Sequence, residues 1–206
     1  MRLPAIHSAR GHFMAAAATV VACALMYFIP QHWQFAAAVE LPLTALDRAI
    51  PFWPASGLVY FGAFVFLVAA FLALRDRGQA TRFLYASLLA QSIGMLVFLF
   101  WPTQYPREAF PLPASAGALG TALVHYVRAT DAPVNCLPSL HVCTATLCAL
   151  ALRGSRWFGP GICIAVLCAA STLTFKQHYL VDVVGGALLG AAAWWVCFRW
   201  RGLQVD

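Results

Sequence analysis

Two short stretches of this sequence place polar side chains inside otherwise apolar runs. CLPSLHVCTA carries Ser139 and His141, and FKQHYLVDVVGG carries His178 and Asp182. His178 and Asp182 are four positions apart, which puts two side chains on one face of a helix. The carboxylate can then accept a hydrogen bond from one imidazole nitrogen and leave the other as a directed lone pair, as in an activated histidine. The alternative is a structural His–Asp pair that ties two helices together.

The first of these stretches also has the composition of an anion-binding site. Pro138 is a residue type favoured in the first turn of a helix, and Ser139 and His141 follow it. The free backbone N–H groups of a helix start bind anions, and a serine hydroxyl adds a donor. Arg107 and Lys176 supply cations that suit phosphate oxygens. These residues together predict a site for an anionic group, although His141 taken alone is equally explained as an interhelical hydrogen bonder.

The composition identifies the kind of fold that positions these residues. The chain has 206 residues, of which 62% are hydrophobic and 10% charged, whereas soluble domains use about 25% charged residues. Apolar runs near 20 residues match the thickness of a bilayer. The sequence therefore predicts an all-α integral membrane bundle of six transmembrane helices, forming a single membrane-embedded domain over residues 1–206 with its catalytic half at about 100–198. The predicted runs are Phe13–Ile29, Gly57–Leu74, Phe83–Trp101, Cys136–Leu152, Trp157–Phe175 and His178–Phe198.

The basic residues predict how this bundle is oriented. Alternate threading of the six runs places nine of the 13 basic residues on one side, which obeys the positive-inside rule and puts both termini in the cytoplasm. The polar motifs then lie on the non-cytoplasmic side, in a multi-pass protein of a bacterial inner membrane. The net charge of +6 thus reflects topology, and we expect no nucleic acid partner. The nine are Arg2, Arg10, Arg75, Arg77, Arg82, Arg153, Arg156, Arg199 and Arg201; the other four are Arg48, Arg107, Arg128 and Lys176.

The segments between and within the runs carry three further signals. Residues 31–54 hold several prolines and aromatic residues, which is typical of a segment at the membrane interface. Residues 102–135 form one long segment, which we interpret as a functional or disordered loop. In the last run, Gly186 and Gly190 are four apart, a spacing that lets helices approach closely, and we expect them to pack within the bundle. The sequence predicts no particular oligomeric state.

The pair PSLH and HYLVDVVGG resembles the second and third signatures of the type 2 phosphatidic acid phosphatase superfamily, six-span membrane enzymes whose core corresponds to roughly the last half of this chain. The resemblance implies attack by His178 on a phosphoryl group, with Asp182 orienting it, to give a phosphohistidine intermediate. It implies His141 as the general acid, and Ser139 with the nearby cations as the groups that hold the phosphate. It also implies a lipid phosphate as substrate, membrane lipids as surroundings, and no metal or other cofactor.

The sequence departs from the family pattern at several positions. If Arg107 is the arginine of the first signature, Phe100 stands where the family has a lysine and Glu108 where it has a proline. Thr172 stands where the third signature has an arginine, six residues before His178. PTQYPR and the HY at the nucleophile resemble the branch that contains inositol phosphorylceramide synthase and sphingomyelin synthase, which transfer head groups between lipids.

Three functions follow as alternatives. The first is a lipid phosphatase, in which water resolves the intermediate. The second is a lipid head-group phosphotransferase, in which an alcohol does so. The third is a non-enzymatic transporter or metal-binding membrane protein in which His141, His178 and Asp182 hold a divalent ion. Arg107 and Lys176 disfavour the third, because they would repel a cation.

Overall fold

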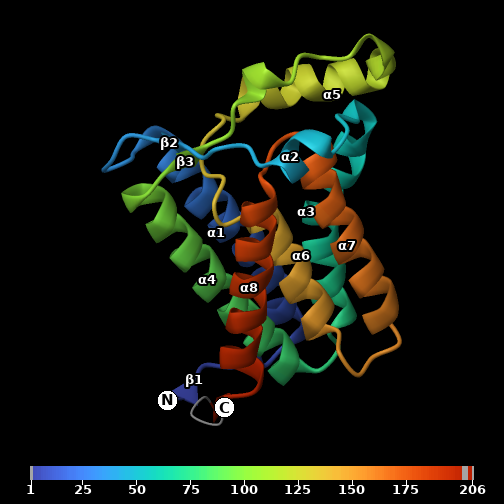
Figure 1. Cartoon of the computed structure of the whole chain (residues 1–206). Helices are drawn as coiled ribbons and strands as arrows, with labels where there is room; N and C mark the ends of the chain where they lie inside the picture. The colour runs from blue at the N-terminus through green and yellow to red at the C-terminus, as the bar shows by residue number, and fades with distance from the viewer. Residues whose placement is uncertain (1, 201–203, 206) are drawn as a thin grey trace.

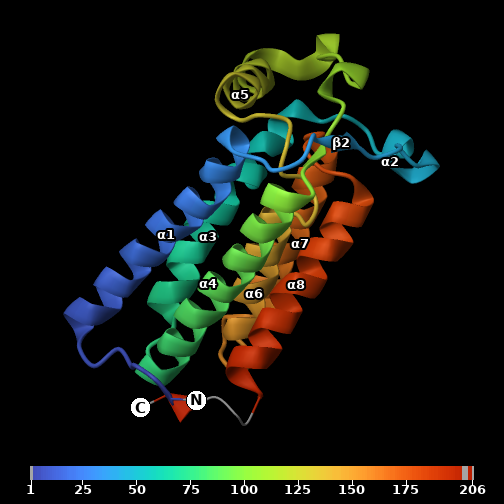
Figure 2. The ribbon, with the colours of Figure 1, turned by 90° about the vertical axis from the view of Figure 1, so that its left-hand side faces the viewer.

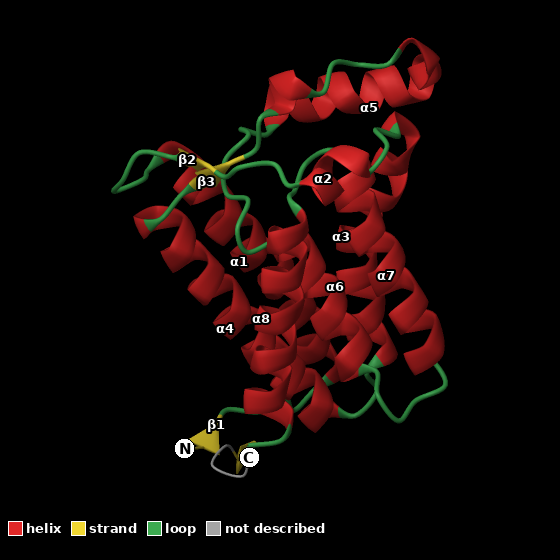
Figure 3. Cartoon of the chain, in the orientation of Figure 1, coloured by secondary structure: helices red, strands yellow, loops and turns green. Residues whose placement is uncertain are grey.

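The structure is a computed structural model that describes residues 2–200 and 204–205. Six of its helices pack side by side in one bundle, and shorter elements cover one end (Figures 1 and 2). In the described residues, strand occurs only as two short pairs outside the bundle (Figure 3). The bundle helices are α1 (Ala9–His32), α3 (Gly57–Ala73), α4 (Arg77–Phe100), α6 (Leu140–Ala151), α7 (Phe158–Thr174) and α8 (Leu180–Phe198).

The predicted all-α membrane bundle is confirmed. Among the residues that the structure describes, four stretches are long and apolar enough to cross a membrane: Ala9–His32, Pro54–Ala73, Arg77–Phe100 and Leu180–Phe198. The other two predicted spans correspond to the shorter apolar helices α6 and α7. At 1.5 Å per residue, the 12 residues of α6 extend about 18 Å, which is less than the hydrocarbon thickness of a bilayer.

Helix α6 is the centre of the bundle. Nine of its residues are buried, and it contacts α3, α4, α7 and α8. Its closest approach is to α8, where a Cβ added at Gly186 would lie 2.3 Å from the backbone oxygen of Ser139, and one at Gly190 would lie 2.5 Å from that of Cys143. The prediction that these glycines pack within the bundle is confirmed. Only glycine permits this approach, which brings the start of α6 beside the start of α8.

One end of the bundle is covered by the two long connecting segments (Figure 1). Strand β2 (Val39–Glu40) pairs in parallel with β3 (Thr103–Gln104), and the short helix α2 (Ala45–Ala49) precedes the 3-10 turn Pro54–Ser56. The second connection contains the 3-10 turns Arg107–Ala109 and Ala114–Ala116 and then helix α5 (Gly117–Thr130). We refer to this end as the capped end.

Helix α5 was not predicted, because the interpretation of residues 102–135 as a loop was wrong for its second half. Val124 and Val127 are buried in a cluster with Tyr60 and Phe175, and Gly120 lies against Pro54. The helix is thus stabilised by contacts with distant parts of the chain, and the Pro- and Gly-rich sequence before it conceals its start.

Both chain ends lie at the end of the bundle opposite α2 and α5 (Figure 1). Strand β1 (Arg2–Leu3) pairs in parallel with β4 (Gln204–Val205). The α3–α4 and α6–α7 connections, which carry Arg75 and Arg153, lie at this end as well. Arg201, which the charge pattern assigned to the same side, lies outside the described residues.

Candidate active site

His178 and Asp182 lie at the capped end of α8. The helix begins at Leu180 with Tyr179 as its N-cap, so the predicted helix start at His178 was wrong by two residues. The predicted hydrogen bond is nevertheless present, with His178 Nδ1 3.2 Å from Asp182 Oδ2. The Tyr179 backbone N–H donates to the same oxygen at 2.9 Å. Because Nδ1 is engaged, Nε2 is the nitrogen that can carry a lone pair into the site, and it makes no hydrogen bond to the described residues.

Ser139 joins the starts of α6 and α8. Its backbone N–H donates to the backbone oxygen of Asp182 at 3.0 Å. Its side chain is the N-cap of α6 and accepts a hydrogen bond from the Val142 backbone N–H at 3.4 Å, which leaves the hydroxyl proton available. Pro138 therefore precedes the cap, and its predicted position in the first helical turn was wrong.

His141 lies in the first turn of α6, and its side chain is in contact with aromatic rings. Its ring stacks on Tyr60 with the centroids 4.0 Å apart, and Phe64 meets it edge-on at 5.4 Å. The His141 and His178 ring centroids are 6.2 Å apart, close enough for one phosphoryl group to contact both. His141 Nε2 is buried and has no hydrogen-bond partner among the described residues. A buried polar atom of this kind marks a place where a ligand or water can supply the missing partner.

Arg107 lies beside the loop that carries His178. The side chain is 7% exposed and donates from Nη2 to Gln177 Oε1 at 2.5 Å and to Asp131 Oδ2 at 3.3 Å. Nη1 donates to the Asp131 backbone oxygen at 2.6 Å, and Nε is buried without a partner in the described chain. The guanidinium is thus fixed next to the residue that precedes His178, and its Nε–H donor is unused.

Asp131 is the residue that organises this corner of the site, and the sequence analysis did not find it. Besides the Arg107 contacts, its Oδ1 accepts hydrogen bonds from Tyr27 at 2.8 Å and from Gln31 at 2.7 Å, both on α1. The only signal available was indirect: a buried arginine requires an anionic or polar partner, and the chain has seven acidic residues from which to choose.

Replacing Asp131 with Asn is expected to lower kcat/KM for phosphate release by roughly 10- to 100-fold, the value of one charge-assisted hydrogen bond. The amide would place a donor against the Arg107 guanidinium and release it from its position. Kinetics of the purified variant measure this, and the loss should fall mainly on KM. Glu108→Gln is the matched control, because Glu108 is adjacent and exposed and should be neutral. An unchanged KM in Asp131→Asn would contradict this role.

Lys176, the second predicted cation, is only 2% exposed and binds main-chain oxygens. Its Nζ donates to Asp47 O at 2.9 Å and to Ile50 O at 2.6 Å, and lies 4.3 Å from the centroid of the Phe110 ring. Burial lowers the pKa of Lys176, and the nearby Asp47 charge partly opposes this. Lys176 thus anchors α2 and its following residue against the loop before α8, and its phosphate contact stays a prediction.

Asp47, also missed from the sequence, caps α8. Its Oδ1 accepts the Leu180 backbone N–H at 2.8 Å, and its Oδ2 accepts from the Thr44 backbone and hydroxyl at 2.9 and 2.6 Å. Burial alone would raise the pKa of Asp47, but the hydrogen bonds from Thr44 and Leu180 lower it overall. The start of α8 is therefore occupied by two carboxylates, those of Asp47 and Asp182. Anion binding by the N–H groups at the start of α6 stays a prediction.

Phe100 and Thr172 stand at the two positions where the family pattern has cations, and the structure shows what their side chains contact. Phe100 is 62% exposed and packs on Phe35 with ring centroids 5.0 Å apart. Thr172 is fully buried and donates its hydroxyl to the Ala169 backbone oxygen at 2.8 Å. Neither contributes positive charge. That Arg107, Lys176 and the start of α6 hold the phosphate stays a prediction.

The alternative of a divalent-ion site requires at least three ligand side chains around one point. Over residues 2–200 and 204–205, no group of three or more His, Cys, Asp or Glu side chains has that arrangement. Asp182 Oδ2 is engaged by His178 and the Tyr179 backbone, while Oδ1 has no partner among these residues.

A family model described as the PAP2 superfamily matches residues 55–196 of this chain. The chain belongs to the PAP2 superfamily. The matched range contains Arg107, both histidine motifs and Asp182, so the resemblance of these motifs to type 2 phosphatidic acid phosphatases is confirmed at the level of the superfamily. Searches among curated proteins and among solved structures gave no match. Membership supports a function of the phosphatase or phosphotransferase type for this PAP2 protein.

Proposed function

We propose that this PAP2 protein is a metal-independent membrane phosphatase that hydrolyses a lipid phosphate monoester or diphosphate through a phosphohistidine intermediate. One observation carries the proposal: His178, oriented by Asp182, and His141, whose Nε2 has no partner in the described chain, have ring centroids 6.2 Å apart. This arrangement matches a nucleophile with its orienting carboxylate and a separate proton donor around one phosphoryl group.

In the first step, His178 Nε2 attacks phosphorus and the bond from phosphorus to the lipid oxygen breaks. Asp182 holds Nδ1–H and stabilises the positive charge that develops on the ring. His141 donates a proton to the leaving lipid oxygen, and the lipid departs as an alcohol (or, from a diphosphate, as a monophosphate). Arg107, Ser139 and Lys176 together with the N–H groups at the start of α6 stabilise the charge on the phosphoryl oxygens.

In the second step, water attacks the phosphohistidine and the P–N bond breaks. His141, now neutral, accepts the proton of the water molecule, and inorganic phosphate leaves. The histidine is thereby returned to its starting protonation state, and His178 regains its free Nε2. The proposed chemistry depends on position and charge, since phosphoryl transfer requires little else from a protein.

We further propose that both termini are cytoplasmic and that the capped end faces the non-cytoplasmic side of a bacterial inner membrane. The support is charge: Arg75, Arg77, Arg153 and Arg156 belong to connections at the end where the termini lie (Figure 1), and short cytoplasmic loops are enriched in such residues. A substrate phosphate would then be reached from the outer leaflet.

A second candidate, a lipid head-group phosphotransferase, uses an alcohol as the acceptor, and its intermediate on His178 is the phosphohistidine or a phosphodiester analogue of it. The PTQYPR and HY segments favour it, because they resemble the branch that transfers head groups between lipids. In that reaction an alcohol, instead of water, attacks the intermediate on His178.

Phosphate release from reconstituted protein tests this proposal. The purified chain in sealed vesicles of known orientation is given short-chain lipid phosphates: phosphatidic acid, phosphatidylglycerol phosphate, isoprenyl diphosphate and sphingolipid phosphates. We expect inorganic phosphate from at least one of them, unaffected by EDTA, and only when substrate is on the side of the capped end. The same assay with added alcohols separates the two candidates, since label appearing in a new lipid indicates transfer.

Three results would count against the proposal. Absence of both phosphate release and transfer with every lipid would exclude the chemistry. Activity lost in EDTA and restored by zinc would favour the metal-binding alternative. Release only when substrate is on the side of the chain ends would contradict an active site at the capped end.

A further inference from the structure

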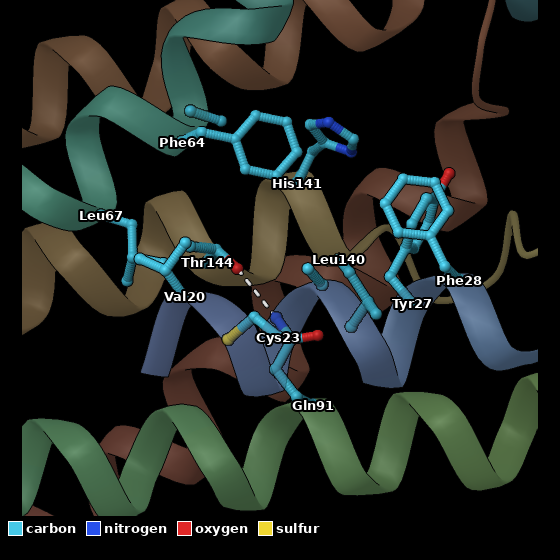
Figure 4. Close-up of a pocket in the computed structure, with 12 residues that line it drawn as sticks. Val20, Cys23, Tyr27, Phe28, Phe64, Leu67, Gln91, Leu140, His141 and Thr144 are labelled. Carbon is cyan, nitrogen blue, oxygen red and sulfur yellow. Dashed lines mark hydrogen bonds between the residues drawn. The ribbon is translucent and has the colours of Figure 1, made fainter. Parts of the chain in front are cut away.

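A narrow apolar cavity of about 90 Å³ lies next to His141 (Figure 4). It is formed between α1, α3, α4 and α6. His141 lines this cavity, and the ring centroid of His178 is 6.2 Å from that of His141, so the cavity lies beside the proposed phosphate site. Its lining residues are Val20, Cys23, Ala24, Tyr27, Phe28, Ala63, Phe64, Leu67, Gln91, Leu140, His141 and Thr144.

The cavity reaches the lipid-facing surface between α1 and α3. Phe28 on α1 and Phe64 on α3 both line it and are 48% and 53% exposed. Because both belong to helices that are apolar enough to span a membrane, their exposed faces meet lipid. A hydrocarbon chain can therefore enter from the bilayer while its phosphate remains at the capped end.

One polar pair interrupts this apolar lining. Gln91 of α4 donates from Nε2 to Thr144 Oγ1 of α6 at 3.1 Å, the dashed line in Figure 4. Gln91 is 5% exposed, and its Oε1 accepts no hydrogen bond from the described residues. An amide has four hydrogen-bonding positions, and one buried in apolar surroundings is destabilising unless they are used. The Gln91–Thr144 pair can therefore form a further hydrogen bond to a ligand.

The position of the pair relative to the catalytic histidine is set by α6. Thr144 follows His141 by three residues, so the two side chains lie on the same face and about 4.5 Å apart along the axis. If His141 protonates the leaving oxygen, the Gln91–Thr144 pair lies roughly one helical turn deeper in the membrane. A group at that depth is a few bonds from the phosphoester oxygen of a lipid.

We propose that Gln91 and Thr144 recognise a hydrogen-bonding linkage, an ester, amide or hydroxyl, in the backbone of the lipid phosphate. The substrate class is then glycerolipid or sphingoid-type phosphates, whose chains carry such a group near the phosphate. Isoprenyl phosphates, whose chains are hydrocarbon from the first carbon, are disfavoured. This inference rests on the proposed function and names the substrate class of that same site.

Substrate preference of the Gln91→Leu variant tests this. We expect wild-type protein to have a kcat/KM about 10-fold higher for phosphatidic acid or ceramide phosphate than for isoprenyl monophosphate of similar length. Gln91→Leu should remove this preference, because it should lower kcat/KM for the ester or amide substrate and leave kcat/KM for isoprenyl monophosphate unchanged. Comparison of phosphatidic acid, which has ester linkages, with ceramide phosphate, which has an amide, shows which linkage the pair recognises. Thr144→Val, which keeps the side-chain shape, should act in the same direction if Gln91→Leu folds poorly.

Ser87→Ala is the matched control, because Ser87 is a buried polar residue one helical turn from Gln91 and does not line the cavity. It should leave the preference unchanged. The inference is overturned if Gln91→Leu and Thr144→Val lower kcat/KM for all substrates equally. In that case the pair only holds α4 against α6. It is also overturned if wild-type protein lacks the preference. Absence of phosphate release from every substrate would instead contradict the proposed function.

Discussion

Replacing His178 with Ala is expected to lower the rate of phosphate release by a factor on the order of 10⁴ or more, the usual consequence of removing a nucleophile. No other imidazole holds the position that Asp182 gives to His178, with Nδ1 at 3.2 Å from the carboxylate and Nε2 unengaged in the described chain. The chemical step therefore has no substitute, while the fold is maintained by other contacts. Single-turnover measurement of phosphate release in detergent solution determines the loss.

The companion variant, His141→Ala, should show a different dependence on the leaving group. With a lipid alcohol as leaving group we expect a loss of about 10²- to 10⁴-fold, the contribution of a general acid. With a nitrophenyl ester, whose leaving oxygen needs no proton, most of that loss should disappear, whereas the His178→Ala loss should remain. His125→Ala, at an exposed position on α5, is the control and should be neutral. Near-normal activity of His178→Ala with either ester would contradict these roles.

Replacing Gly186 with Ala should also have a large effect, through the spacing of helices. The new Cβ would lie 2.3 Å from the backbone oxygen of Ser139, so α6 and α8 must move apart. Overpacking of this kind destabilises by about 1–3 kcal/mol. A displacement of about 1 Å between His141 and His178 would lower kcat by roughly 10²-fold. Thermal unfolding and kcat of the purified variant check both effects.

Gly62→Ala is the matched control for this variant. Gly62 is also within a membrane helix, and a Cβ there meets nothing within 4 Å. The same substitution should be neutral or slightly stabilising at that position, because alanine favours helix more than glycine does. If Gly186→Ala behaves like Gly62→Ala in stability and in kcat, the close approach of α6 and α8 does not set the geometry of the site.

The parts of the fold that depend on local composition were predictable. Apolar runs located all six bundle helices, because a residue in lipid must be apolar over a whole helix length. The Gly186 and Gly190 spacing indicated close packing in the same way. Helix α5 was not predictable on these grounds, since Val124 and Val127 are buried by Tyr60 and Phe175 from other helices. The starts of α6 and α8 were displaced by a few residues because the caps, Ser139 and Tyr179, were not identified.

The candidate site, like the fold, was predictable only where it depends on local sequence. The His178–Asp182 hydrogen bond follows from a spacing of four and was predictable. Asp131 and Asp47 were not, because their partners are distant in sequence: Asp131 binds Tyr27 and Arg107, and Asp47 binds Leu180. Only the folded chain brings these groups together.

Identification of the phosphorylated residue tests the central claim most directly. Wild-type protein is mixed with radiolabelled lipid phosphate, quenched in alkali within milliseconds to preserve phosphoramidates, and mapped by mass spectrometry. We predict an acid-labile phosphoryl group on the imidazole of His178, absent from His178→Ala. A phosphoryl group on any other residue, or phosphate release at the normal rate with no covalent intermediate detected, would contradict the account.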